Sequence, residues 1–252
     1  MFKLSLLLIL LPSISFAGQL ELDVCTHVHH QPPYYLGTTT DMPEKGKRGI
    51  FADALDRTAD QLHIKINWHR LPWKRCLAGF KAKQFDSLLG AVHTDERALI
   101  ARFPKNKTGK IDNKRAMSAV HYHLYENRNN PLKWKGGFEF ETSRFTIGSP
   151  RGFIITRMLQ EKHVPVTESL SPVDGFHKLN QGRLTGYVYP KEATPYVLSK
   201  IPGSELIVRR LDPALWITYI HLPIRHEIYN MYPDIIEKLW TIYAGFIQEE
   251  LP

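Results

Sequence analysis

The sequence predicts an α/β protein of two lobes, each a mostly parallel sheet flanked by helices. Three observations predict it: segments typical of strands and of helices alternate in the first half of the chain, the same alternation returns in the second half, and one more strand and helix follow near the end. The chain has 252 residues, of which 43% are hydrophobic and 23% are charged, so its length allows a sizeable core.

The first α/β unit begins at residue 20. Residues 20–25 alternate apolar with polar side chains, which is typical of a strand. Residues 49–62 place apolar side chains at the i, i+3, i+4, i+7 spacing of an amphipathic helix. The unit continues with a strand at 64–68, a helix at 73–82 and a short apolar strand at 85–92.

The second α/β unit follows a strand expected at 116–125. Its expected strands are 144–148, 164–167 and 184–188, and its expected helices are 152–162, 172–181 and 192–199. A strand at 216–222 and an amphipathic helix at 233–249 follow toward the end. Strands and helices alternating in this order are typical of a doubly wound sheet.

Two such units imply a chain that passes from one lobe to the other and back. We expect the crossings near residues 122–126 and 215–219. Lobe 1 then comprises residues 18–122 plus 218–252, and lobe 2 comprises residues 123–217. Because ligands bind at the carboxyl ends of parallel strands and in clefts between lobes, we expect the binding site there.

The first 17 residues resemble a cleavable export signal. Lys3 provides a positive charge, Leu4 to Leu11 an apolar run, and Ser15-Phe16-Ala17 a small-residue cleavage site. A membrane anchor is the alternative, but the apolar run is about half of the roughly 20 residues that a spanning helix needs. We therefore expect cleavage after Ala17 and a soluble protein in the periplasm.

Charge and cysteine content limit the function classes. The formal net charge of +8 favours anionic partners. Outside the cytoplasm, Cys25 and Cys76 could form a disulfide or remain two buried thiols. We expect the disulfide, which would close a loop of about 50 residues and add ~4 kcal/mol of stability. The sequence contains no serine-hydrolase, nucleotide-binding or zinc-protease motif, and without a basic helix nucleic acid is not an expected partner.

Four short segments carry a family resemblance. They are Gln31-Pro32-Pro33-Tyr34-Tyr35, the run from Lys83 to Ala91, Thr94-Asp95-Glu96-Arg97, and the turn Gly182-Arg183-Leu184. They resemble bacterial periplasmic solute-binding proteins of family 3, the polar amino acid type that serves ABC importers. The resemblance implies the two-lobed type II periplasmic binding protein fold. It also implies a non-enzymatic monomer, without cofactor or metal, that binds a small-molecule ligand and presents it to an inner-membrane ABC permease.

The resemblance also implies ligand contacts in the first lobe. Arg97 corresponds to the arginine that binds the carboxylate of the ligand, a role that suits the paired donors of a guanidinium. Tyr34 and Tyr35 correspond to an aromatic wall, although either could instead pack at the hinge. Gly90 and Ala91 lie where backbone groups meet the carboxylate and the amine. A solvated position on the first turn of a helix is the alternative for Arg97.

Further contacts are expected around the cleft. Gln31 could contact the ligand or lie at the hinge, and Trp73 could stack on the ligand or pack at the start of its helix. Arg151 and Gly152 precede an expected helix in the second lobe. Positive charge beside a helix N-terminus would favour an anion there.

Departures from the family bear on the ligand. Amino acid binders of the family usually have Ser or Thr near the position of Gly90, a Thr where Ile154 stands, and an Asp late in the second lobe for the ammonium of the ligand. Residues 185–190 contain no acid. Because a buried ammonium without a carboxylate is costly, we expect a small polar, carboxylate-bearing, amino acid-like solute rather than an ordinary α-amino acid.

Other interpretations involve histidines and the same fold. His27, His29 and His30 follow the first strand, but no further ligand is fixed nearby, so we expect no metal site. Some relatives of the fold are periplasmic dehydratases, for which Glu192, His30 or His93 would be the acid–base candidates. A soluble sensor partner of a membrane receptor would need only the same clamp.

Overall fold

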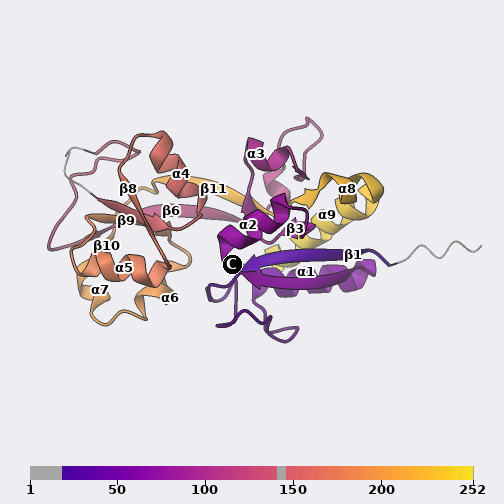
Figure 1. Ribbon diagram of the computed structural model, residues 1–252, viewed down its shortest axis with the longest axis horizontal. Helices are drawn as coiled ribbons and strands as arrows, with labels where there is room; N and C mark the ends of the chain where they lie inside the picture. Colours follow the sequence, from indigo (N-terminus) through magenta and orange to yellow (C-terminus); the bar gives the residue numbers. More distant parts are fainter. Residues whose placement is uncertain (1–18, 141–145, 252) are drawn as a thin grey trace, which may run out of the picture.

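The computed structural model describes residues 19–140 and 146–251, which form two β-sheets with helices packed around them (Figure 1). The expected export signal, residues 1–17, lies outside the described residues, as do residues 144 and 145 of an expected strand. Within the described ranges, no helix has both the length and the apolar character needed to cross a membrane.

The first sheet has five strands. β1 (Glu21–His27) pairs in parallel with β2 (Lys65–Leu71) and with β3 (Ser87–Leu88). β12 (Ile224–Arg225) pairs antiparallel with β3 and with β5 (Ala101–Arg102). The spatial order is therefore β2-β1-β3-β12-β5.

Three helices pack against this sheet: α1 (Ile50–Leu62), α2 (Trp73–Lys81) and α9 (Pro233–Glu250). The long helix α9 lies against α1 and buries Trp240 and Tyr243 in the core between them. The Trp240 indole donates to the backbone oxygen of Leu222 (2.7 Å), and the Tyr243 hydroxyl donates to that of Phe51 (2.9 Å). The buried polar ends of these rings are thus paired, as an apolar core requires.

The second sheet has seven strands. In spatial order they are β4 (Ala91–Val92), β11 (Trp216–His221), β6 (Ser118–Asn127), β9 (Gly186–Pro190), β7 (Ile147–Pro150) and β8 (Val166–Ser169), with β10 (Val208–Arg210) also paired to β6. Nearby helices are α4 (Ile154–Glu161), α5 (Pro172–Asn180), α6 (Thr194–Leu198) and α7 (Ser204–Ile207). Shorter elements are α3 (Asp95–Ala98), a 3₁₀ turn (Asn113–Arg115) and α8 (His226–Met231).

The expected α/β architecture is confirmed, with sheets that mix parallel and antiparallel pairs. β6 leads the chain from the elements around the first sheet to those around the second, and β11 leads it back, so the two strands pair antiparallel (Figure 1). Parallel pairing is retained in β2-β1-β3 and in β9-β7-β8. The expected strand at 85–92 is divided because Gly90 has a φ of 90°, which sends β3 and β4 into different sheets. The lobe boundaries expected at residues 122 and 218 fall within β6 and β11.

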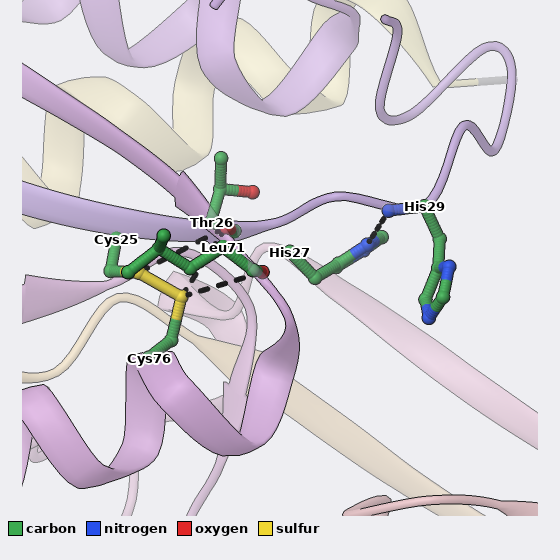
Figure 2. Close-up of a disulfide and its surroundings, with 6 residues drawn as sticks. All are labelled: Cys25, Thr26, His27, His29, Leu71 and Cys76. Carbon is green, nitrogen blue, oxygen red and sulfur yellow. Dashed lines mark hydrogen bonds between the residues drawn. A yellow bond between two sulfur atoms is a disulfide. The ribbon is translucent and has the colours of Figure 1, made fainter. Parts of the chain in front are cut away.

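A disulfide joins Cys25 of β1 to Cys76 of α2 (Figure 2). Both cysteines are fully buried, and their Cα atoms are 5.6 Å apart. The expected bond is confirmed over the alternative of two free thiols. It encloses the loop after β1, all of α1 and all of β2, which is one edge strand of the first sheet.

Replacing both cysteines by Ala (C25A/C76A) should lower the free energy of unfolding by ~4 kcal/mol, because the unfolded chain regains the entropy of a loop with a sequence separation of 51. Urea unfolding of both proteins, with and without a reductant, measures this difference. The reductant should shift the midpoint of the natural protein alone. Equal unfolding free energies of the two oxidised proteins would contradict the prediction.

His221 is a buried histidine at the end of β11, with 1% of its surface exposed. Neither ring nitrogen makes a hydrogen bond of standard geometry with a described residue, and the ring lies 6.0 Å from that of Phe103. Burial lowers the pKa of His221 to about 4, and the charge of His93 acts in the same direction, while the backbone of Asp112 opposes the shift. His221 is therefore neutral in the folded protein at neutral pH.

The free energy of unfolding should fall as the pH drops from about 6.5 to about 4. In that window the unfolded chain binds a proton on His221 and the folded chain does not, which costs up to ~3 kcal/mol from this residue. The variant His221→Gln should show a shallower dependence on pH in urea unfolding at pH 7, 5 and 4. Exposed His177 supplies the control, His177→Gln, which should keep the full dependence. An unchanged slope in His221→Gln would refute this assignment.

Candidate functional site

A cleft of about 750 Å³, its open mouth included, lies between elements of the two sheets. Its lining is mostly aromatic and aliphatic, with few polar side chains. One wall comes from the end of β1, the loop after it and the starts of α1 and α2; the other comes from β6, the start of α4 and the segment after β9. The cleft therefore has the place that the sequence predicted for a binding site.

A tight turn shapes the loop after β1. The backbone N–H groups of Tyr34 and Tyr35 both donate to the Gln31 oxygen (2.9 Å each), and the Gln31 N–H donates to the Tyr35 oxygen (2.7 Å). The Tyr35 ring then packs between the rings of His27 (4.2 Å) and Phe51 (5.1 Å). This packing turns Gln31, Tyr34 and Tyr35 toward the cleft as a group.

Arg70 of β2 holds the same loop from behind. Its side chain donates to the backbone oxygens of Val28 (2.8 Å), Gly37 and Thr39, and only 4% of the residue is exposed. Among the described residues it forms no ion pair with a carboxylate. Burial lowers the pKa of Arg70 from its ordinary value. Its charge is thus stabilised by backbone dipoles, and the loop is fixed at three points.

Gly90 lies directly beside this group. A Cβ atom at Gly90 would come within 2.2 Å of the Tyr35 hydroxyl oxygen, and the φ of 90° is unfavourable for any residue with a side chain. The tyrosine hydroxyl occupies the space that a Ser or Thr side chain would need. The departure from the family pattern at Gly90 therefore follows from the presence of Tyr35.

Arg97 provides the positive charge of the cleft. It lies on α3, which Thr94 caps by accepting the Arg97 N–H at 3.2 Å. Its Nη1 donates to the Val92 oxygen at 2.7 Å, and it makes no ion pair within the described part of the chain. Burial lowers the pKa of Arg97, yet a guanidinium remains charged at any physiological pH. A partly buried cation that has no carboxylate partner among the described residues is poised to bind an anion.

Glu192 provides the negative charge on the other wall. It follows β9, and its Oε1 lies 2.6 Å from Nδ1 of His121, while its charge helps to raise the pKa of Tyr34 across the cleft after the larger effect of burial. The cleft therefore contains an acidic side chain, which the sequence did not predict. Residues 185–190 do lack an acid, but the chain turns after Pro190 and directs the next acidic residue into the cleft.

The expected ligand contacts divide into two groups. The cleft brings together Gln31, Tyr34, Tyr35, Trp73, Gly90 and Arg97. Ala91 is fully buried within β4, where it pairs with His221. Gly152 lies on a neighbouring groove behind Arg97, and Arg151 is exposed and pairs with Glu168 at 3.3 Å. The expected helix start is also two residues later, so that Phe153 and Ile154 face the cleft instead.

Several lining residues were not anticipated from the sequence as ligand contacts. They are His27, Phe51, Val92, Ser118, Ala119, Val120, Tyr122, Phe153, Ile154, Pro190, Glu192, Ala193 and Ile220. Most are apolar residues of strands and helix starts, where a pattern cannot distinguish a core position from a cleft wall. The sequence indicates Glu192 only as an acid–base candidate of the dehydratase alternative, and His27 only as a member of a histidine cluster too small for a metal site.

Contacts across the mouth join elements of the two sheets. Lys74 of α2 pairs with Glu168 of β8 at 3.0 Å, and Glu96 of α3 pairs with Arg157 of α4 at 3.4 Å. Deeper in, the Gln31 amide donates to the Tyr189 hydroxyl, where both residues are buried. The two walls are therefore held in contact around the cleft.

Comparison with known proteins identifies the fold. No family model and no curated protein matches the sequence. Among solved structures, a histidine kinase sensor domain with similarity to periplasmic binding proteins superposes with a TM-score of 0.70 at 15% identity, over 92% of this chain and 96% of that one. The chain has the fold of periplasmic binding proteins.

Two further structures support the same conclusion. The GluR0 ligand-binding core from Nostoc punctiforme in complex with L-glutamate has a TM-score of 0.67 at 15% identity, covering 90% of this chain and 96% of that one. An ancestral arginine-binding protein bound to arginine has a TM-score of 0.67 at 16% identity, covering 91% and 97%. Identities this low show the fold alone, and the ligand of this chain has to be argued from its own residues.

Arg70→Lys should lower the free energy of unfolding by about 1–3 kcal/mol, because an ammonium cannot satisfy three separate backbone oxygens in place of the guanidinium. Amide hydrogen exchange across residues 28–39 should become faster in this variant. The exposed Arg75 offers a matched control, Arg75→Lys, which should change neither quantity. If exchange in the loop were the same in both variants, Arg70 would not be what fixes it.

Proposed function

We propose that the protein is a periplasmic solute-binding protein of the family 3 type, which closes around an amino acid-like, carboxylate-bearing solute and presents it to an inner-membrane ABC permease. The observation that carries the proposal is Arg97, a partly buried guanidinium in the cleft with no acidic partner among the described residues. The fold supports ligand binding between two walls, and the sequence resemblance supports the family.

Arg97 suits a carboxylate by geometry as well as charge. Its Nη1 is occupied by the Val92 oxygen, which fixes the side chain and leaves other N–H donors for a ligand. A guanidinium binds both oxygens of a carboxylate through parallel hydrogen bonds. The apolar rings around it exclude water, which strengthens that interaction.

Glu192 suits the ammonium group of the same solute. When His121 carries its proton on Nδ1, it donates to Oε1 of Glu192, and the backbone N–H of His121 donates to Oε2 at 3.4 Å. These two bonds orient the carboxylate, and each oxygen keeps a further lone pair with which it can accept from a ligand. A zwitterion could then place its carboxylate at Arg97 and its ammonium at Glu192. Both charges of the ligand would then lie beside opposite charges. The free-energy cost of burying an unpaired ammonium would not arise, so an α-amino acid becomes a suitable ligand.

Closure of the two walls would couple binding to recognition by a permease. Arg97 and Glu192 belong to different walls, so a ligand that binds both favours the closed arrangement over an open one. The cross-mouth pairs of Lys74 with Glu168 and of Glu96 with Arg157 are consistent with such a closed arrangement.

Arg97→Ala should raise the Kd of a bound α-amino acid by roughly 30-fold or more, which corresponds to a loss of about 2–5 kcal/mol. A thermal-shift screen of amino acids, dicarboxylates, sugars and short peptides would first find the ligand, since saturation at about 100 times Kd adds ~2.7 kcal/mol of stability. Calorimetric titration then measures the variant. The exposed Arg183 provides the control Arg183→Ala, which should bind normally. Unchanged affinity in Arg97→Ala would remove the central claim.

Glu192→Gln separates amino acids from ligands that carry only a carboxylate. For an α-amino acid the variant should lose affinity, since the ammonium loses its counter-charge. For a carboxylate without an amine it should bind equally well or better. The same titrations, followed by NMR of the recovered solute, also test the dehydratase alternative. A product that forms over time would favour catalysis at the His121–Glu192 pair over the proposed role in transport.

A further inference from the structure

His27 is a buried polar side chain in the wall of the cleft that the proposed function leaves without a role. It is the last residue of β1, 7% of its surface is exposed, and it lines the cleft. Its ring contacts the Tyr35 ring at 4.2 Å and lies 5.8 Å from the ring of His29. The His27 ring is therefore packed closely against Tyr35, with His29 farther away.

The backbone fixes which nitrogen of His27 carries the proton. The N–H of His29 approaches Nδ1 of His27 at 3.1 Å (Figure 2). A backbone N–H can only donate, so Nδ1 must be the acceptor and a neutral ring must carry its proton on Nε2. The bond from His29 is the one hydrogen bond of the His27 side chain to a described residue, so Nε2–H is left for a ligand.

The charge around His27 keeps the ring neutral. Burial lowers its pKa well below the ordinary value, and the nearby His29 and Arg70 act in the same direction. No acidic residue opposes them there. Burial lowers the pKa of His29 as well, so Arg70, which holds the same loop from behind, is the cation that acts on this site. His27 therefore offers a donor without a charge of its own, with a fixed positive charge behind it.

We propose that His27 is a specificity-determining residue whose Nε2–H selects solutes with an oxygen acceptor on the side chain and, with the positive charge of Arg70 behind it, rejects solutes with a cationic side chain. This inference rests on the proposed function, in which Arg97 and Glu192 bind the two backbone charges of the solute. Glu192 is the one acid among the described lining residues, so its use for the α-ammonium leaves no carboxylate for a second cation.

The proposal is tested with matched pairs of amino acids. L-tyrosine and L-phenylalanine differ by a hydroxyl, L-glutamine and L-norleucine compare an amide with an alkyl chain, and L-lysine and L-norleucine compare a cation with an alkyl chain. Calorimetric Kd values should favour at least one acceptor-bearing member by about 2- to 10-fold, the range of a single hydrogen bond. L-lysine should bind more weakly than L-norleucine.

Variants separate specificity from structural support. His27→Asn keeps an oxygen that can accept the His29 N–H but lacks a donor at the Nε2 position, so the preference should fall to about 1. His27→Gln places an amide nitrogen near that position and should restore the preference. His29→Gln is the matched control, because the bond to Nδ1 comes from its backbone and the preference should persist.

A spectroscopic measurement examines the ligand-free protein. Long-range ¹H–¹⁵N correlation of the histidine rings should show His27 as the neutral, Nε2-protonated form at pH 7. A charged ring, or a proton on Nδ1, would overturn the proposal.

The outcomes also separate this inference from the proposed function. If His27→Asn bound both amino acids of a pair more weakly by the same factor, so that the preference was retained, His27 would have a structural role. That result would overturn this inference but leave the proposed function standing. Binding of L-lysine as tight as that of L-norleucine would do the same. Absence of any amino acid binding that depends on Arg97 would overturn the proposed function and, with it, this inference.

Discussion

The binding cleft depends on a cation buried behind a loop. Arg70 donates to backbone oxygens on both sides of the loop that follows β1, and this loop carries Gln31, Tyr34 and Tyr35. A loop with this many polar backbone groups would ordinarily be solvated and mobile. The guanidinium of Arg70 supplies several donors from one rigid plane. Because Arg70 belongs to β2, these hydrogen bonds attach the loop firmly to the first sheet.

A chain of contacts carries this constraint into the site. The held loop positions Tyr35, Tyr35 packs on His27, and the Tyr35 hydroxyl excludes a side chain at Gly90. The disulfide fixes the same end of β1 to α2, which begins with Trp73 of the cleft wall. One wall of the site is thereby preorganised, so less conformational entropy is lost when a solute binds.

Periodicity in the sequence predicted most of the helices and the long strands, because amphipathic spacing reflects burial that is local to each element. It did not predict how strands pair, since the antiparallel pairing of β6 with β11 arises from the direction of the two crossings. The family resemblance predicted Arg97, because this residue ends the short motif Thr94-Asp95-Glu96-Arg97, which can be recognised from the sequence alone. The sequence did not predict Glu192 and His27 as part of the cleft lining, because their positions depend on which way a loop or a strand end faces, and no local pattern encodes that direction.

The ion pairs across the mouth differ from the buried contact beneath them in one respect. Lys74, Glu96 and Arg157 expose more than half of their side-chain surface, and Glu168 about a quarter, whereas Gln31 and Tyr189 are shielded from solvent. Mobile ions screen exposed charges over about 8 Å at physiological ionic strength, but they do not reach a buried amide–hydroxyl pair. A rise in ionic strength would therefore weaken the ion pairs at the rim and leave the deeper hydrogen bond intact. The contact between the two walls thus has an outer part that responds to salt and an inner part that does not.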